Sequence, residues 1–161
     1  MSTGKFSPKA SYPIGIFDSG IGGLTVAKAI NDLLPHEQLV YFGDTAHMPY
    51  GEKSPHAIKD YSIKIAEFLI LQPCKLIVIA CNSASATAFK QVQAILPDKH
   101  FVINVIDPVV EHIVSQAKYK KIGLIGTKRT VSSAVYKKKF VFLLLFWVDQ
   151  NCLIFLPKVY N

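Results

Sequence analysis

Cysteine is scarce in this 161-residue chain, and no CxxC pair or regular spacing of metal ligands is present. Its three cysteines, Cys74, Cys81 and Cys152, are too few for the disulfide framework of a small secreted domain. The N-terminal segment lacks the apolar stretch of a signal peptide. The longest apolar run, residues 140–148, is far shorter than the roughly 18 residues that span a bilayer. We therefore expect a cytoplasmic protein with no membrane partner and no bound metal.

Acidic residues are missing from one stretch of the chain. The sequence has 18 Lys and Arg against 11 Asp and Glu, which gives a formal net charge of +7. Eight of the basic residues fall within residues 118–139, where no acid occurs, and the remainder is close to neutral. A local lysine cluster is usually a solvated face, and no nucleic-acid recognition motif is present. We expect no nucleic-acid partner.

Short apolar runs alternate with helical periodicity over most of the chain. Five strands alternating with helices predict an α/β fold with a doubly wound, mostly parallel sheet. Residues 1–12 are polar, and we expect them to form a disordered leader. Residues 140–161 show no clean period and are expected to be an atypical apolar tail. The strands are predicted at residues 13–17, 38–42, 76–80, 101–106 and 121–125, and the helices at 24–34, 55–71, 83–96, 109–117 and 130–139.

Residues 75–89 place a cysteine at the end of a predicted strand. Residues 76–80 are typical of a buried strand, and Asn82 or Ser83 is predicted to cap the helix that follows. Cys81 would then lie at the sheet edge where ligands bind in open α/β folds. The N-terminus of a helix favours a thiolate, which would lower the pKa of this thiol. A structural cysteine that merely ends a strand is the alternative interpretation, which this segment alone favours about equally.

A second predicted strand ends in Asp18, Ser19 and a glycine-rich turn. The glycines stand at positions 20, 22 and 23, so the GxGxxG spacing is absent. Asp18 could cap a helix, orient an ammonium group or act as the acid–base partner of a thiol. Further along, Tyr50 and the Gly51 N–H could close a small polar pocket, or form an ordinary Pro-Tyr-Gly turn.

The polar residues that directly follow predicted strands are expected to meet in space, because the carboxyl ends of parallel strands share one edge. His47 and His56 lack a paired ligand spacing and are predicted to be surface residues. The residues expected to converge on one pocket are Asp18, Ser19, Cys81, Asn82, Ser83 and Thr127.

Five segments of the chain resemble the motifs of glutamate racemase, within the aspartate/glutamate racemase superfamily. The resemblance covers roughly residues 13–136 and implies two α/β domains with the active site between them. Residues 13–97 would then be the first domain and residues 98–139 the start of the second. The segments, in chain order, are IGIFDSGIGGLTV, YFGDTAHMPYGEKS, IVIACNSASATA, VINVIDPVV and KIGLIGTKRTV.

This resemblance implies an isomerase that interconverts L- and D-glutamate without a cofactor and supplies D-glutamate for peptidoglycan. One thiolate would remove the α-proton, and a thiol on the opposite face would return one. By resemblance, Cys81 is one of this pair and Asp18 assists its proton transfer. We expect glutamate as the small-molecule partner and a homodimer as a candidate assembly. The residues implied to hold the substrate are Asp18, Ser19, Tyr50, Gly51, Asn82, Ser83 and Thr127.

The chain departs from the family in one respect that concerns catalysis. The second catalytic cysteine of the family lies in a downstream Gly-Cys-Thr-His motif, which this sequence lacks. Cys152 is not followed by Thr-His. We therefore expect a C-terminally truncated racemase with impaired activity. The alternatives are an inactive fragment and a small α/β module that binds glutamate without turnover.

Overall fold

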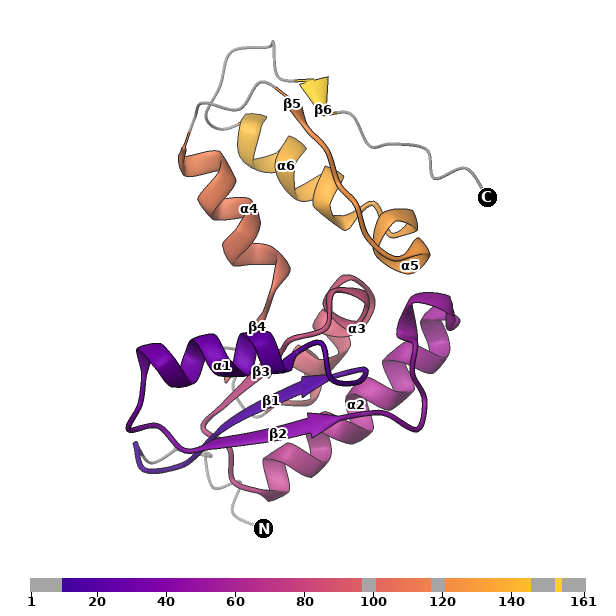
Figure 1. Cartoon of the computed structure of the whole chain (residues 1–161). Helices are drawn as coiled ribbons and strands as arrows, with labels where there is room; N and C mark the ends of the chain where they lie inside the picture. Colours follow the sequence, from indigo (N-terminus) through magenta and orange to yellow (C-terminus); the bar gives the residue numbers. More distant parts are fainter. Residues whose placement is uncertain (1–9, 97–100, 117–120, 146–152, 155–161) are drawn as a thin grey trace.

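The computed structural model describes residues 10–96, 101–116, 121–145 and 153–154 (Figure 1). Its centre is a parallel sheet of four strands in the order β2-β1-β3-β4. The predicted α/β fold with a doubly wound sheet is confirmed. The strands are β1 (Ile14–Asp18), β2 (Leu39–Gly43), β3 (Leu76–Ile79) and β4 (Val102–Asn104).

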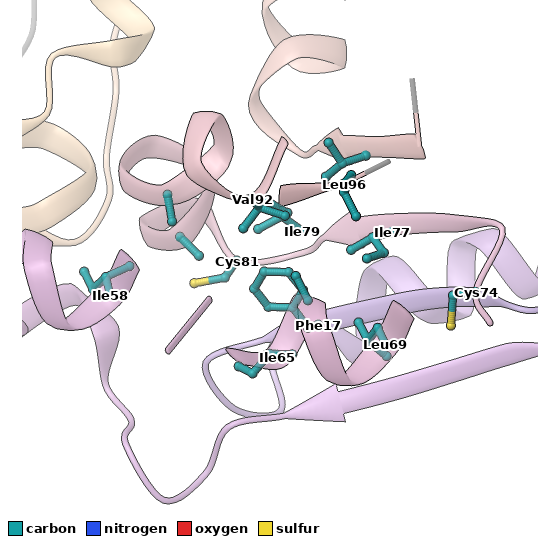
Figure 2. Close-up of a cluster of buried hydrophobic side chains, with 14 of the residues drawn as sticks. Phe17, Ile58, Ile65, Leu69, Cys74, Ile77, Ile79, Cys81, Val92 and Leu96 are labelled. Atoms are coloured by element: carbon teal, nitrogen blue, oxygen red, sulfur yellow. The ribbon is translucent and has the colours of Figure 1, made fainter. Parts of the chain in front are cut away.

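Helices cover both faces of this sheet, which explains why all five residues of β1 are buried. Helix α1 (Leu24–Leu33) packs on one face through Val26, Ala27 and Ile30. On the opposite face, α2 (Pro55–Leu71) and α3 (Asn82–Ile95) enclose the larger apolar cluster, part of which Figure 2 shows. The centre of that cluster is formed by Phe17, Ile58, Leu69, Ile77, Ile79, Ala88 and Val92.

Local sequence signals set the bounds of α2 as predicted. Pro55 occupies the first turn, where the N–H that proline lacks would have no helical partner. The hydroxyl of Ser54 accepts a hydrogen bond from the N–H of Ala57 at 3.2 Å and so caps the helix. The predicted range, residues 55–71, agrees with the observed one.

Beyond the sheet, the chain forms a second group of helices. Helices α4 (Ile106–Ser115) and α6 (Val135–Leu145) pack against each other (Figure 1). In the sequence, β5 (Lys121–Ile122) and the short α5 (Lys128–Ser132) come between these two helices. Their buried cluster consists of Ile106, Val110, Tyr136 and Phe140.

Two predictions about strands and loops are corrected here. The fifth predicted strand, β5, pairs in parallel with β6 (Leu153–Ile154) and forms a separate two-stranded sheet. The strand predicted at residues 101–106 ends earlier, at Asn104, and the helix predicted from residue 109 already begins at Ile106, because Asn104 Oδ1 accepts the N–H groups of Ile106 and Asp107 and starts α4.

The helix predicted at residues 130–139 is two helices. Ala134 separates α5 from α6 with a left-handed φ of 54°. Helix α6 then continues to Leu145, into the segment expected to be an atypical tail. Residues 1–9 of the expected leader, and Cys152, lie outside the described residues. No helix within the described ranges is long and apolar enough to cross a membrane.

Candidate active site

A pocket of about 470 Å³ opens at the carboxyl ends of β1 and β3. The sheet order reverses between these strands, because β1 leads to β2 on one side and β3 lies on the other. Ligands bind at such switch points in doubly wound folds. All eight residues singled out from the sequence line this pocket: Asp18, Ser19, Tyr50, Gly51, Cys81, Asn82, Ser83 and Thr127.

Cys81 directly precedes α3 at the end of the β3 segment. It takes the N-cap position with extended backbone, so the prediction that Asn82 or Ser83 caps the helix is wrong. Only 6% of Cys81 is exposed, and Figure 2 shows it beside Phe17 at the start of α3. Its Sγ donates a hydrogen bond to Ser19 Oγ at 3.5 Å. The thiol therefore belongs both to the buried core and to the pocket wall.

The pKa of Cys81 is raised, whereas the sequence predicted that the helix N-terminus would lower it. Burial is the largest cause, because it disfavours the charged thiolate. The Ser19 hydroxyl and the backbone N–H groups of Ala84 and Ser19 act in the opposite direction, and the charge of Asp18 adds to the increase. The helix terminus thus stabilises the thiolate but does not outweigh its desolvation.

Asp18 holds the glycine-rich turn that precedes α1. Its buried Oδ2 accepts the N–H groups of Gly20 at 3.1 Å and of Gly23 at 3.0 Å. Gly23 is the N-cap of α1, and a Cβ there would lie 2.7 Å from the Cβ of Asp18. Asp18 therefore organises the start of this helix and also lines the pocket. Its role at the helix start is compatible with a second role toward a ligand or toward the thiol.

Tyr50 and Gly51 begin a single 3-10 turn, η1 (Tyr50–Glu52), and both are buried. The Tyr50 hydroxyl donates to Asp44 Oδ2 at 2.6 Å. Gly51 packs directly on Thr127: a Cβ at position 51 would lie 2.6 Å from the Thr127 Cβ. Glycine is required at this position because of that close approach.

Thr127 and Tyr136 bring the second group of helices to the pocket. Thr127 Oγ1 and Ser83 Oγ are 2.8 Å apart, and the Tyr136 hydroxyl donates to Asn82 Oδ1 at 2.7 Å. Thr127 also caps α5 by accepting the N–H of Thr130. Thr127 was expected at the edge of the main sheet, but it arrives from β5, which belongs to the other sheet.

Sequence reasoning missed three residues that support this pocket. Asp44 follows β2, so the rule that selected residues after strand ends could have found it. Thr130 and Tyr136 contact Ser83 and Asn82 across 47 and 54 residues of sequence, respectively, and no local pattern marks them. His47 is exposed, as predicted, but its Nδ1 lies 2.8 Å from Asp44 Oδ1.

The first turn of α3 gives the pocket an electropositive side. Helix α3 has 14 residues, and its first turn contains no acidic residue. The free N–H groups of a helix N-terminus bind anions such as carboxylates. Within the described parts of the chain, no group of three or more His, Cys, Asp or Glu could hold a metal ion. The arrangement places the sulfur of Cys81 beside a helix terminus of the kind that binds anions.

Comparison with known proteins identifies the family. The sequence profile described as Asp/Glu/Hydantoin racemase matches residues 19–143. The chain belongs to this family. Among relatives in the family, the glutamate racemase of Geobacter metallireducens is 47% identical over 125 residues, which is 78% of this chain and 46% of that protein.

Solved structures of the family share the fold. A glutamate racemase from Francisella tularensis, solved in complex with D-glutamate, matches with a TM-score of 0.79 and 38% identity over 91% of this chain and 52% of its own. The isoform RacE1 from Bacillus anthracis matches with a TM-score of 0.82 and 36% identity over 92% of this chain and 53% of its own. The chain spans about half the length of the relatives that it matches.

Proposed function

We propose that this chain forms one half of a glutamate racemase active site, in which Cys81 transfers the α-proton of glutamate without a cofactor. The observation that carries the proposal is the position of Cys81 Sγ in one pocket with Asp18, Ser19 and the N-terminus of α3. A helix N-terminus suits the α-carboxylate of an amino acid. The complex of a related enzyme with D-glutamate supports glutamate as the ligand.

The chemistry of the reaction explains these residue types. The α-proton of an amino acid is very weakly acidic, so a strong base must approach it while nearby dipoles stabilise the developing negative charge. The raised pKa of Cys81 makes its thiolate more basic, while Ser19 and the Ala84 N–H stabilise that thiolate. The thiolate takes the proton to become a thiol, and the bonding electrons remain on the substrate, whose carboxylate lies at α3.

Inversion requires a second proton donor on the opposite face of the substrate. Of the two cysteines within the described ranges, Cys81 lines the pocket and Cys74 does not. Cys74 Sγ instead faces the backbone of Gly15, where a Cβ would lie 2.9 Å away. The proposal therefore assigns this chain proton exchange on one face of glutamate. A complete enzyme would supply D-glutamate for peptidoglycan in the cytoplasm.

Two measurements on the 161-residue chain test this function. Calorimetry is expected to show saturable binding of glutamate to the wild type and to Cys74→Ala. Circular dichroism is expected to show that neither L- nor D-glutamate is inverted. Inversion that disappears in Cys81→Ala would overturn the assignment of a half-site. The absence of any glutamate binding would overturn the proposed ligand.

A further inference from the structure

Asp44 connects two parts of the pocket that are far apart in sequence. Its backbone N–H donates to the carbonyl oxygen of Asp18 at 2.9 Å, at the end of β1. Its carboxylate accepts the hydroxyl of Tyr50 at 2.6 Å. One residue thus ties the turn that holds Asp18 to the turn that holds Tyr50, although Asp44 itself does not line the pocket.

The carboxylate of Asp44 is buried, and hydrogen-bond donors surround it. Only 7% of Asp44 is exposed, and a buried carboxylate is costly unless donors compensate it. Tyr50 is one donor, and His47 lies at 2.8 Å on the other oxygen. The His47 ring stacks on Tyr61 of α2 at a centroid distance of 4.0 Å. The O–H···O contact at 2.6 Å has the length of a charge-assisted hydrogen bond, which is about twice as strong as a neutral one.

A displacement of Tyr50 would also move Thr127 and Ser83, which line the same pocket. Gly51 follows Tyr50 and packs against Thr127 so closely that not even a methyl group fits between them. Thr127 in turn shares a hydrogen bond of 2.8 Å with Ser83 in the first turn of α3. The position of Tyr50 therefore affects the positions of the Thr127 and Ser83 hydroxyl groups.

We propose that Asp44 is a positioning residue of the glutamate pocket, which holds the turn of Tyr50 and Gly51 against Asp18 and thereby sets the affinity for glutamate. This inference rests on the proposed function. Asp44 acts through Tyr50 and does not touch the substrate. A purely structural role would instead change the stability of the chain and leave the affinity of the folded protein unaltered.

Substitutions at both ends of the hydrogen bond test this coupling by calorimetry with glutamate. Asp44→Leu removes the acceptor with little change in size, and we expect about tenfold weaker binding, the loss of one strong hydrogen bond. Asp44→Asn keeps a neutral acceptor and is expected to restore part of the affinity. Tyr50→Phe should weaken binding to a similar extent as Asp44→Leu. The double variant, Asp44→Leu with Tyr50→Phe, should bind no more weakly than Asp44→Leu, because both substitutions remove the same hydrogen bond.

The matched control is Asp60→Leu on α2. Asp60 forms a similar carboxylate–histidine pair, with His56 at 3.3 Å, but it is half-exposed and lies outside the pocket lining. This variant is expected to bind glutamate as the wild type does. An unchanged affinity in Asp44→Leu, or effects of Asp44→Leu and Tyr50→Phe that multiply in the double variant, would overturn the inference.

A measurement without ligand separates this inference from the proposed function. The buried Tyr50 hydroxyl proton is expected to give a slowly exchanging, downfield ¹H resonance, which Tyr50→Phe assigns by its loss. In Asp44→Asn this resonance should move upfield, and the Lys53 amide, which bonds to the Tyr50 carbonyl at 3.1 Å, should exchange about tenfold faster.

The outcomes remain distinct even if Asp44→Leu fails to fold, because Asp44→Asn then carries both measurements. A wild type that does not bind glutamate would overturn the proposed function. An unchanged Tyr50 resonance and unchanged Lys53 exchange in Asp44→Asn would overturn the role of Asp44.

Discussion

The sheet region, from β1 to β4, and the helical region, from α4 to α6, bury their apolar side chains in different ways. In the sheet region, helices cover both faces, and β1, whose end faces the pocket, is buried along its whole length. In the helical region, α4 and α6 pack on each other, and Ile125, just before Thr127, is 95% exposed. The first region supplies most of the residues that line the pocket, and the second contributes to the site through a few side chains.

This difference teaches which parts of the pocket depend on the fold as a whole. Asp18, Ser19 and Cys81 lie at strand ends within the enclosed sheet. Thr127 lines the same pocket and shares a hydrogen bond with Ser83, and Tyr136 supports the pocket from outside its lining by donating to Asn82. We therefore expect substitutions in the sheet region to affect global stability, and substitutions at the contacts between the regions to affect the pocket locally.

The largest expected effect separates the two cores. Phe17 is completely buried in the sheet region, and Phe17→Ala should lower the free energy of unfolding by about 3–5 kcal/mol. Phe140→Ala in the helical region should cost less, because its smaller cluster can close around the cavity. Denaturant titrations followed by circular dichroism measure both. Equal losses would break the distinction between the regions.

The next effect lies where the regions meet, at Gly51. A methyl group there would collide with Thr127, so Gly51→Ala should destabilise the protein by about 1–3 kcal/mol and weaken glutamate binding. Gly123→Ala is the matched control, since a Cβ at Gly123 meets no described atom within 4 Å. Thr127→Gly removes the collision but also the α5 cap and the bond to Ser83, so the double variant should be destabilised by less than the sum of the two single substitutions. A Gly51→Ala protein as stable as Gly123→Ala would show that the contact is loose.

A smaller loss is expected for Tyr136→Phe, which removes the hydroxyl that bonds to Asn82. The hydrogen bond contributes on the order of 1 kcal/mol, and the ring remains packed on α4. Thermal denaturation should therefore shift by only a few degrees. A loss as large as that of Phe17→Ala would mean that the helical region is part of one indivisible core.

The smallest expected effects concern the titration of Cys81 within the sheet region. The Ser19 hydroxyl lowers the pKa of Cys81, so Ser19→Ala should move the pH profile of alkylation toward higher pH. The charge of Asp18 raises the pKa of Cys81, so Asp18→Asn should move the profile toward lower pH. Iodoacetamide labelling, resolved by peptide mass spectrometry, measures both shifts, with the remote Cys74 as internal reference. If both substitutions shifted the alkylation profile in the same direction, Ser19 and Asp18 would not have opposite effects on the pKa of Cys81.

The fold and the pocket residues could be predicted because their signals are local. Short β-branched runs followed by polar residues mark the strand ends at Asp18 and Cys81, and parallel strands bring those ends together. The pKa direction of Cys81 was predicted wrongly, since burial by α2 and α3 is a property of the packed structure. Asp44 follows β2, so the same rule could have found it, whereas Tyr136 acts through a tertiary contact that sequence spacing does not encode.

Hydrogen exchange at the α-carbon of glutamate tests most directly whether Cys81 moves the proton. We predict that, in D₂O, the 161-residue chain incorporates deuterium into one enantiomer without inverting it, as followed by NMR. Cys74→Ala should retain this exchange and Cys81→Ala should lose it. Exchange at the wild-type rate in Cys81→Ala, or no exchange in a wild type that binds glutamate, would contradict the role assigned to this sulfur.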